Sequence, residues 1–353
     1  MNEDELLTYI QRIVLLMVER IEELDLSRED TEKILIRELR DLLDQAGVTV
    51  EEALPKIIAD SYFGGAEAAT VLMAEAGAAA AVVERPFKRQ MHRAAIEQIL
   101  DDALLDFRAA LRTAAETGDQ TITETLREVR DEFAKGMIGG ENRRKITKRV
   151  AETFAKKGMT AFTTVDGRRL PLDFYAMTVT RTKTRMATVA GSMARYEEMG
   201  QDLVQINENP DSCAICSAHD GLVVSMTGQT EGFPVAGTDV QLPPYHPNCR
   251  GTVRPYVASR KDREAIEAAK KRAREFDPNE DRRTPLQRQQ YEEEQEKRRI
   301  ANQEKKTYAN WLSIFGDRAP KTIGAFRRMK RQNTPRYQAL AAEYNRTIRG
   351  GSG

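Results

Sequence analysis

The sequence is poor in cysteine, histidine and aromatic residues. Its 353 residues include three cysteines, three histidines and one tryptophan, and aromatic residues make up 6%. All three cysteines lie between positions 213 and 249, whereas a secreted disulfide framework usually has an even number spread along the chain. Thiols clustered with a histidine instead favour metal ligation in a reducing compartment. Few aromatic and many charged residues (31%) indicate long exposed helices rather than a dense β-sandwich.

Long apolar runs and the common catalytic motifs are also missing. No segment reaches the ~18 apolar residues of a membrane-spanning helix, and the alanine-rich run at 74–83 is short and follows no charged leader. We therefore expect no signal peptide, no transmembrane helix and no membrane partner. The serine-hydrolase elbow, the phosphate-binding loop and the dinucleotide glycine motif are absent from the sequence. Since three histidines also offer few acid–base groups, we expect that the protein is not an enzyme.

The formal net charge is zero, but the charge is unevenly distributed. Residues 1–60 hold 16 acidic and seven basic side chains, whereas residues 260–353 hold 24 basic and 14 acidic ones. A basic tail suggests a polyanionic neighbour or an acidic partner surface, with a solvated helical surface as the alternative. Residues 318–353, with nine basic side chains and one acidic, are where we expect contact with DNA.

The N-terminal part reads as a series of amphipathic helices. Apolar residues recur at helical spacing from Leu6 onward, and glycines or prolines mark expected interruptions. We expect helices at 6–21, about 27–43, 49–63, 66–83, 86–117 and 119–139, followed by a basic amphipathic helix at 142–157. Their many apolar faces favour packing into a bundle or association of copies into a homo-oligomer.

The expected secondary structure becomes mixed after residue 140. Asp166–Gly167 between β-favouring residues predicts a hairpin, and a long helix follows from Asp173 to Gly200. Short strands are expected at 203–206, 222–226 and 252–256, with charged helices from 259 onward broken by prolines. The predicted fold is mainly α with a small α+β zinc-knuckle module. We divide it into a helical domain (1–140), an α+β module (141–257) and a basic helical region (258–353).

Three cysteines and one histidine form two matched pairs. Cys213 and Cys216 are separated by two residues, as are His246 and Cys249, and 29 residues lie between the pairs. A two-residue gap allows both side chains of a pair to reach one tetrahedral ion. Four such ligands leave no open position for water, so the sequence predicts a structural metal site, with zinc as the ion.

Other interpretations of the pairs stay open. Cys213 and Cys216 could form a redox pair, although a thioredoxin-like pair opens a helix in a βαβ unit, whereas Asp220–Gly221 and a strand follow here. The cysteines could also pack without metal. A His-Asn-His-like nuclease built on a zinc knuckle would need another histidine as base, and His219 is the nearby candidate. His219 is also a spare ligand outside the paired spacing.

Several short motifs follow one another in a specific order between residues 140 and 257. They are Lys157-Gly-Met-Thr-Ala-Phe-Thr, Asp166-Gly-Arg-Arg, Tyr175 with Arg181 and Arg185, Gly200-Gln-Asp-Leu-Val-Gln-Ile, the first cysteine pair, and Tyr245-His-Pro-Asn-Cys-Arg-Gly. In this order they resemble the phage minor capsid protein 2 family, which is similar to the broader Mu-type head-morphogenesis proteins. The chain departs from the family at Ala218 and His219, where many relatives have an aromatic residue.

This resemblance implies a structural minor head protein of a tailed bacteriophage or prophage. Such a protein is expected at or near the portal vertex, assisting head assembly and DNA packaging or ejection. The implied partners are the portal or major capsid protein, and packaged double-stranded DNA at the basic C-terminal region. The implied location is the virion, and the bacterial cytoplasm during assembly. Carried over by position, the family's metal ligands are Cys213, Cys216, His246 and Cys249. The alternative is a zinc-knuckle nucleic-acid-binding protein or a His-Asn-His-like nuclease.

Overall fold

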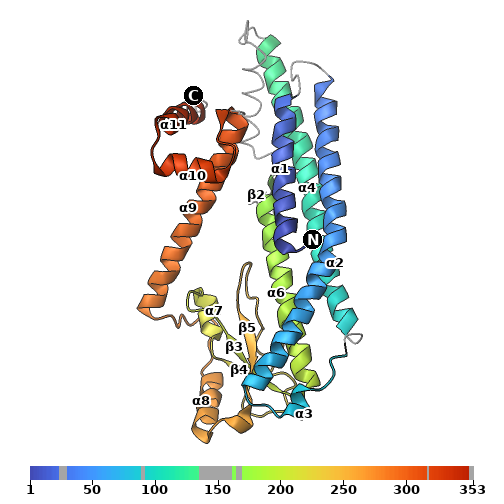
Figure 1. The fold of residues 1–353 in the computed structure, drawn as a ribbon, viewed down its shortest axis with the longest axis vertical. Coiled ribbons are helices and arrows are strands. Elements are labelled where there is room, and N and C mark those ends of the chain that lie inside the picture. Colours follow the sequence, from blue (N-terminus) through green and yellow to red (C-terminus); the bar gives the residue numbers. More distant parts are fainter. Residues whose placement is uncertain (24–29, 89–91, 135–160, 164–168, 316–317, 350–353) are drawn as a thin grey trace. The chain divides into compact units, whose positions relative to one another are not determined.

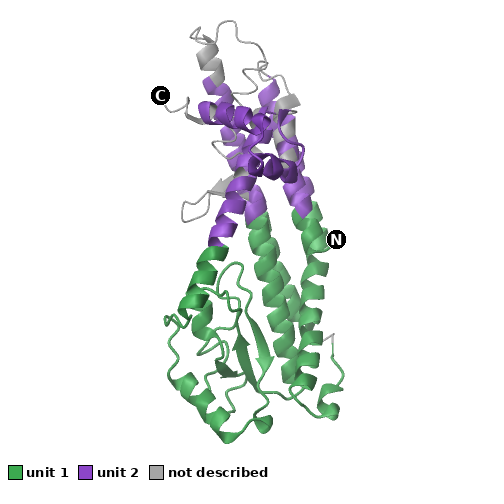
Figure 2. Ribbon diagram, turned by 60° about the vertical axis from the view of Figure 1, so that its left-hand side comes forward, with its two compact units in different colours: residues 1–7, 48–108, 175–294 green, residues 8–47, 109–174, 295–353 purple. Residues whose placement is uncertain are grey.

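The computed structural model describes residues 1–23, 30–88, 92–134, 161–163, 169–315 and 318–349. Helices dominate and two small sheets accompany them (Figure 1), which confirms the expected mainly α fold with a small α+β part. The chain divides into two compact units that interleave along the sequence (Figure 2). Unit 1 contains residues 1–7, 48–108 and 175–294, and unit 2 contains residues 8–47, 109–174 and 295–353. The domain boundaries at 140 and 257 stay a prediction.

Long helices make up the N-terminal part. They are α1 (Glu3–Glu23), α2 (Thr31–Glu75), the short α3 (Ala80–Val83) and α4 (Arg93–Ala134). The interruptions expected at Gly47, at Gly64–Gly65 and near Gly118 were wrong, because α2 and α4 continue through them. A glycine inside a helix costs only about 1 kcal/mol relative to alanine. Burial of one continuous apolar face exceeds this cost; in α2 that face includes Leu35, Leu39, Leu43, Leu54 and Ile58.

Two glycines allow α2 to approach α6 (Leu172–Glu198) very closely. A Cβ atom on Gly65 would lie 2.0 Å from the carbonyl oxygen of Thr188, and the Ser192 hydroxyl donates to the Gly65 carbonyl over 2.9 Å. Gly65 therefore serves helix packing in unit 1 and does not end a helix. α6 itself agrees with the helix expected at 173–200.

Strands β1 (Ala161–Thr163) and β2 (Arg169–Pro171) pair antiparallel just before α6, with Phe162 opposite Leu170. This pairing fits the hairpin expected around Asp166–Gly167. That turn itself, and the helix expected at 142–157, lie outside the described residues.

The three strands expected after α6 form one antiparallel sheet in unit 1. Its order is β4–β3–β5, with β3 (Leu203–Asn207) between β4 (Val223–Ser225) and β5 (Thr252–Pro255). Alternate residues of β3 enter two different apolar clusters, since Val204 packs in one and Leu203 in the other. The first cluster includes residues of α2 and α6, and the second has alanines of α8 (Arg263–Arg274) against it. Burial on both faces fixes the sheet as a rigid support for the loops at its ends.

The C-terminal helices are α9 (Pro285–Phe315), α10 (Ile323–Arg331) and α11 (Pro335–Arg349), preceded by a 3-10 turn at Ala258–Arg260. Prolines begin α9 and α11, where a missing N–H costs nothing. The sequence looks poor in apolar residues here, yet α9, α10 and α11 share an aromatic core. Its buried members are Trp311, Phe315, Ala319, Phe326 and Leu340.

Candidate metal centre

The first cysteine pair lies on a short helix between β3 and β4. Cys213 is the N-cap of α7 (Ala214–His219), and its carbonyl accepts a hydrogen bond from the Ser217 N–H over 2.9 Å. After α7, Gly221 adopts a φ of 74° as the chain turns toward β4. β3 and β4 are antiparallel, so this surrounding differs from the parallel βαβ unit that carries a thioredoxin-like pair.

The second pair lies in the loop that leads into β5. Asn248 adopts a left-handed conformation with a φ of 65°, which asparagine tolerates better than most residues. The Cys249 N–H donates to the His246 carbonyl over 3.0 Å. This tight turn brings both side chains of the pair to Cys216.

The structure brings all four predicted ligands together around Cys216. The Nε2 atom of His246 lies 3.1 Å from Sγ of Cys216 and 3.2 Å from Sγ of Cys213, and the sulfurs of Cys216 and Cys249 are 3.6 Å apart. Metal–ligand bonds of about 2.0–2.3 Å put the ligand atoms of a tetrahedral zinc site roughly 3.5–3.8 Å apart. These three separations are close to the expected values, whereas the Cys249 sulfur shares no group within 4.8 Å with Cys213 or His246. The four ligand atoms are therefore gathered near one another but are wider apart than around a bound ion.

The possible ligand atoms form two groups of three that share one residue. Within each group, all ligand atoms lie within 4.8 Å of one another. The outer group is Cys213, Cys216 and His246, and the inner group is Glu208, Cys216 and Cys249. Cys216 belongs to both. All three residues of the inner group are buried, whereas Cys213 and His246 are partly exposed.

Hydrogen bonds within the cluster favour thiolates at two of the three cysteines. The hydrogen bond with Cys216, and to a smaller extent the one with His246, lower the pKa of the Cys213 thiol to about 3. The bond with Cys216 and the Gly251 N–H, 3.5 Å from the sulfur, lower the pKa of Cys249 to about 6. Cys216 keeps the shared proton, so the pKa of its thiol is raised. The bond with Cys213 raises the pKa of His246 to about 9. Sulfur in the thiolate form is what a metal ion binds.

Glu208 is the residue of this site that sequence reasoning missed. It follows β3 directly, is 8% exposed, and its N–H donates to Asp220 over 2.8 Å. Burial, with the neighbouring Cys249 and Asp220, raises the pKa of its carboxyl group to about 8. Its Oε1 atom has no hydrogen-bond partner among the described residues. The only signal in the sequence is an acidic residue between a buried strand and the first cysteine pair.

His219 lies beside the cluster in a packing role. Its ring stacks on Tyr245 with centroids 4.1 Å apart and meets Phe276 edge-on at 5.0 Å. Its Nδ1 atom is 2.8 Å from the Ile215 carbonyl, and burial lowers its pKa. His219 belongs to neither ligand group.

A second buried polar network lies in unit 1. The Tyr62 hydroxyl donates to Nδ1 of His92, and the Nε2–H of His92 donates to Glu198, each over 3.1 Å. Burial acts to raise the pKa of Glu198, but hydrogen bonds from His92, the Lys88 N–H and Arg195 lower it overall. Phe87 stacks on His92 with centroids 4.6 Å apart. These contacts fix the segment around residues 87–88 to α2 and α6 and account for every polar atom of the imidazole.

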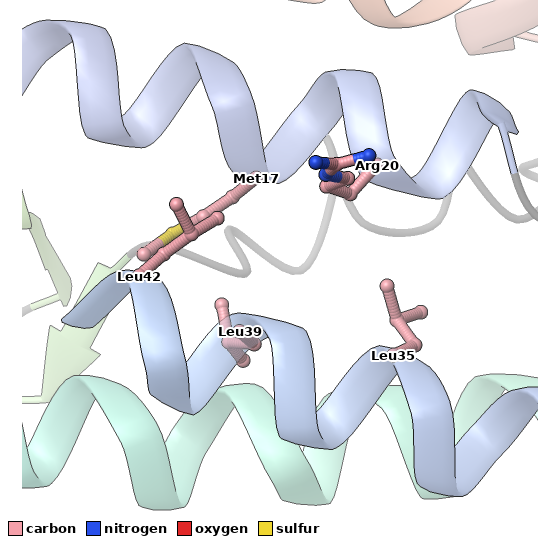
Figure 3. A pocket seen from close by; sticks show the side chains of 5 residues that line it. All are labelled: Met17, Arg20, Leu35, Leu39 and Leu42. Atoms are coloured by element: carbon pink, nitrogen blue, oxygen red, sulfur yellow. The ribbon is translucent and has the colours of Figure 1, made fainter. Parts of the chain in front are cut away.

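Unit 2 contains a small apolar hollow between α1 and α2 (Figure 3). It is lined by Met17, Arg20, Leu35, Leu39 and Leu42. A single guanidinium among apolar side chains lacks the set of converging polar groups that orients a small ligand. We therefore interpret the hollow as a gap in helix packing and not as a ligand site.

Ion pairs engage part of the basic C-terminal region. Glu304 on α9 binds Arg327 and Lys330 of α10 at 3.1 and 2.7 Å. Arg328 and Arg331, also on α10, are exposed. These two residues lie three positions apart, on one face of the helix.

The family model of phage minor capsid protein 2 matches residues 2–313. No curated protein and no solved structure matches the sequence significantly. Among the helices that the structure describes, none is long and apolar enough to cross a membrane.

Proposed function

The chain belongs to the phage minor capsid protein 2 family, and on this premise we propose that it is a structural head protein whose α+β part is held together by one zinc ion. In this proposal Cys213, Cys216, His246 and Cys249 bind the ion. The protein acts at or near the portal vertex of a tailed phage, where it assists head assembly and DNA packaging or ejection.

The observation that supports this proposal best is the convergence of two loops on one sulfur. Cys216 contacts His246 and Cys249, although about thirty residues separate them in the sequence. Sulfur and imidazole are the donor types that structural zinc sites use, and four of them leave no position open for a reacting water. A bound ion would cross-link the loop after β3 to the loop before β5. The expected role is therefore stability of the sheet rather than catalysis.

The metal content of the purified protein tests the proposal directly. We expect about one zinc ion per chain by elemental mass spectrometry, and its loss when Cys249 and Cys216 are both replaced by alanine. Protein prepared without chelator that contains no metal would show that the cluster is not a metal site. The cysteines would then be tested for disulfide formation.

Alanine variants of two histidines separate a structural site from a nuclease. The His246→Ala variant should bind zinc more weakly and loosen the loops around the cluster. The His219→Ala variant should keep its zinc, because His219 is a packing residue. Divalent-metal-dependent DNA cleavage by the wild-type protein that disappears in the His219→Ala variant without loss of fold would favour a His-Asn-His-like nuclease instead.

The basic C-terminal region supplies the contact with DNA in this proposal. Acids neutralise Arg318, Arg327 and Lys330, whereas Arg328 and Arg331 lie exposed at the end of α10. Packaged DNA is a dense polyanion, and replacing its counterions with arginines favours binding. An acidic surface of the portal or of the major capsid protein is the other partner of matching charge, and repeated copies of the chain would multiply either contact.

A further inference from the structure

Glu208 is a further possible metal ligand beside the two matched pairs of Cys and His residues. Its carboxylate lies within 4.8 Å of the sulfurs of Cys216 and Cys249. Its side chain is nearly inaccessible, and its Oε1 atom lacks a hydrogen-bond partner among the described residues. Leaving an oxygen of a buried carboxyl group unpaired costs free energy, and a bound cation would offset this cost.

The local backbone leaves room for this carboxylate and little else. A Cβ atom on Gly251 would lie 2.0 Å from Oε1 and 3.0 Å from Oε2 of Glu208. The Glu208 N–H is held by Asp220. The carboxylate is therefore confined between the Gly251 backbone and the two buried cysteines.

We propose that Glu208 is a reserve ligand, which completes the metal site from the inner group when Cys213 of the outer group is lost. The inference rests on the proposed zinc site. Cys213 is the most exposed of the three thiols, and hence the one that oxidants and alkylating reagents reach first. Both ligand groups share Cys216, so a bound ion would keep this ligand in either set.

Charge favours exchange of Glu208 for Cys213 over addition of a fifth ligand. Three thiolates and a neutral imidazole give a zinc site a net charge of −1, and a carboxylate in addition would give −2 in a buried place. Replacement of the Cys213 thiolate by the Glu208 carboxylate keeps the net charge at −1. The resulting set would be the inner group of Glu208, Cys216 and Cys249, joined by His246, which contacts Cys216 but lies outside that group. Its oxygen, nitrogen and sulfur donors are of the types that zinc accepts.

Cobalt(II) binding to the full-length chain tests the inference, because the thiolate-to-cobalt absorption band reports the number of sulfur ligands. The Cys213→Ser variant should still bind about one cobalt ion per chain, with a weaker band than the wild type. The Cys213→Ser/Glu208→Gln double variant should lose the ion. Glu231→Gln in the Cys213→Ser background is the matched control, since Glu231 is exposed in the loop between the two pairs and belongs to neither group.

The outcomes separate the inference from the zinc site itself. Equal cobalt binding by the Cys213→Ser variant with and without Glu208→Gln would overturn the reserve role, whether both chains keep the ion or both lose it through failure to fold. Absence of metal from the wild-type protein would instead overturn the zinc site.

Discussion

The carbonyl oxygen of Tyr62 on α2 lies against Gly191 on α6, only 1.9 Å from where a Cβ atom of residue 191 would be. A Gly191→Ala change must therefore push the two backbones apart. We expect a loss of about 1–3 kcal/mol in the free energy of unfolding, as for other overpacked sites. Urea unfolding followed by circular dichroism measures it.

Gly64→Ala is the matched control for Gly191→Ala. Gly64 lies on the same helix as Tyr62, and nothing lies within 4 Å of a Cβ atom built on it. This variant should gain about 0.5–1 kcal/mol from the better helix propensity of alanine. Equal destabilisation by both variants would contradict the close approach of α2 and α6.

Asp202 should make the free energy of unfolding decrease as the pH falls into the acid range. Its carboxylate accepts hydrogen bonds from the Ser225 hydroxyl at 2.8 Å, the Thr227 N–H at 2.9 Å and the Thr227 hydroxyl at 2.6 Å. Burial acts to raise its pKa, but these bonds together with one from Thr230 lower it to about 2. A lowered pKa stabilises the fold above the unfolded value of about 4, and this contribution disappears as the pH falls from 4 to 2.

The Asp202→Asn variant should accordingly cost on the order of 1–2 kcal/mol at pH 6. The difference from the wild type should shrink at pH 2.5, where the wild-type carboxylate is partly protonated. Urea midpoints at the two pH values measure it. A difference that stays constant with pH would contradict the lowered pKa of Asp202.

The fluorescence of Trp311 reports on the C-terminal helices alone. It is the single tryptophan and is 1% exposed, with its ring edge-on to Phe326 at 5.0 Å. Phe326→Ala should destabilise this aromatic core by about 3–5 kcal/mol and shift the tryptophan emission to longer wavelength. Ile300→Ala, at a residue 49% exposed on α9, should leave the emission unchanged; a red shift in this variant too would show that the emission reports the whole helix.

DNA binding by the basic region should depend on the arginines that no described acid neutralises. The Arg328→Ala/Arg331→Ala variant should weaken binding to double-stranded DNA and reduce the salt slope by about 2. The Arg327→Ala/Lys330→Ala variant removes the same charge from residues that Glu304 already binds, so its effect should be smaller. Fluorescence anisotropy across a salt series measures both. Equal slopes for the two variants would favour a diffuse charge effect over a contact at these arginines.

The sequence allowed prediction of those features that depend on short-range patterns. Short apolar segments indicated the three strands of the sheet, and two equal gaps identified the four residues that the structure gathers around Cys216. Ligand spacing is local within each pair, so it is visible without the fold. The ligation itself stays a prediction until a metal is measured.

Features that depend on partners far apart in the sequence could not be predicted. Gly64–Gly65 looked like a helix break, because only α6 shows that Gly65 is a contact point. Glu208 joins the cysteines through a loop whose path no local pattern gives. Trp311 is one apolar residue in a charged region, and its core forms only when Phe326 and Leu340 arrive from two other helices.

The order of strands in the sheet also bears on how the chain matures during synthesis. β4 follows β3 closely in the sequence, whereas β5, the partner of the other edge of β3, ends only at Pro255. The same delay separates the first cysteine pair from the second. A chain that stops early has an open edge on β3, a template for aggregation, and half of the proposed ligands. With the proposed ion, only a chain translated beyond Cys249 would hold it with all four ligands.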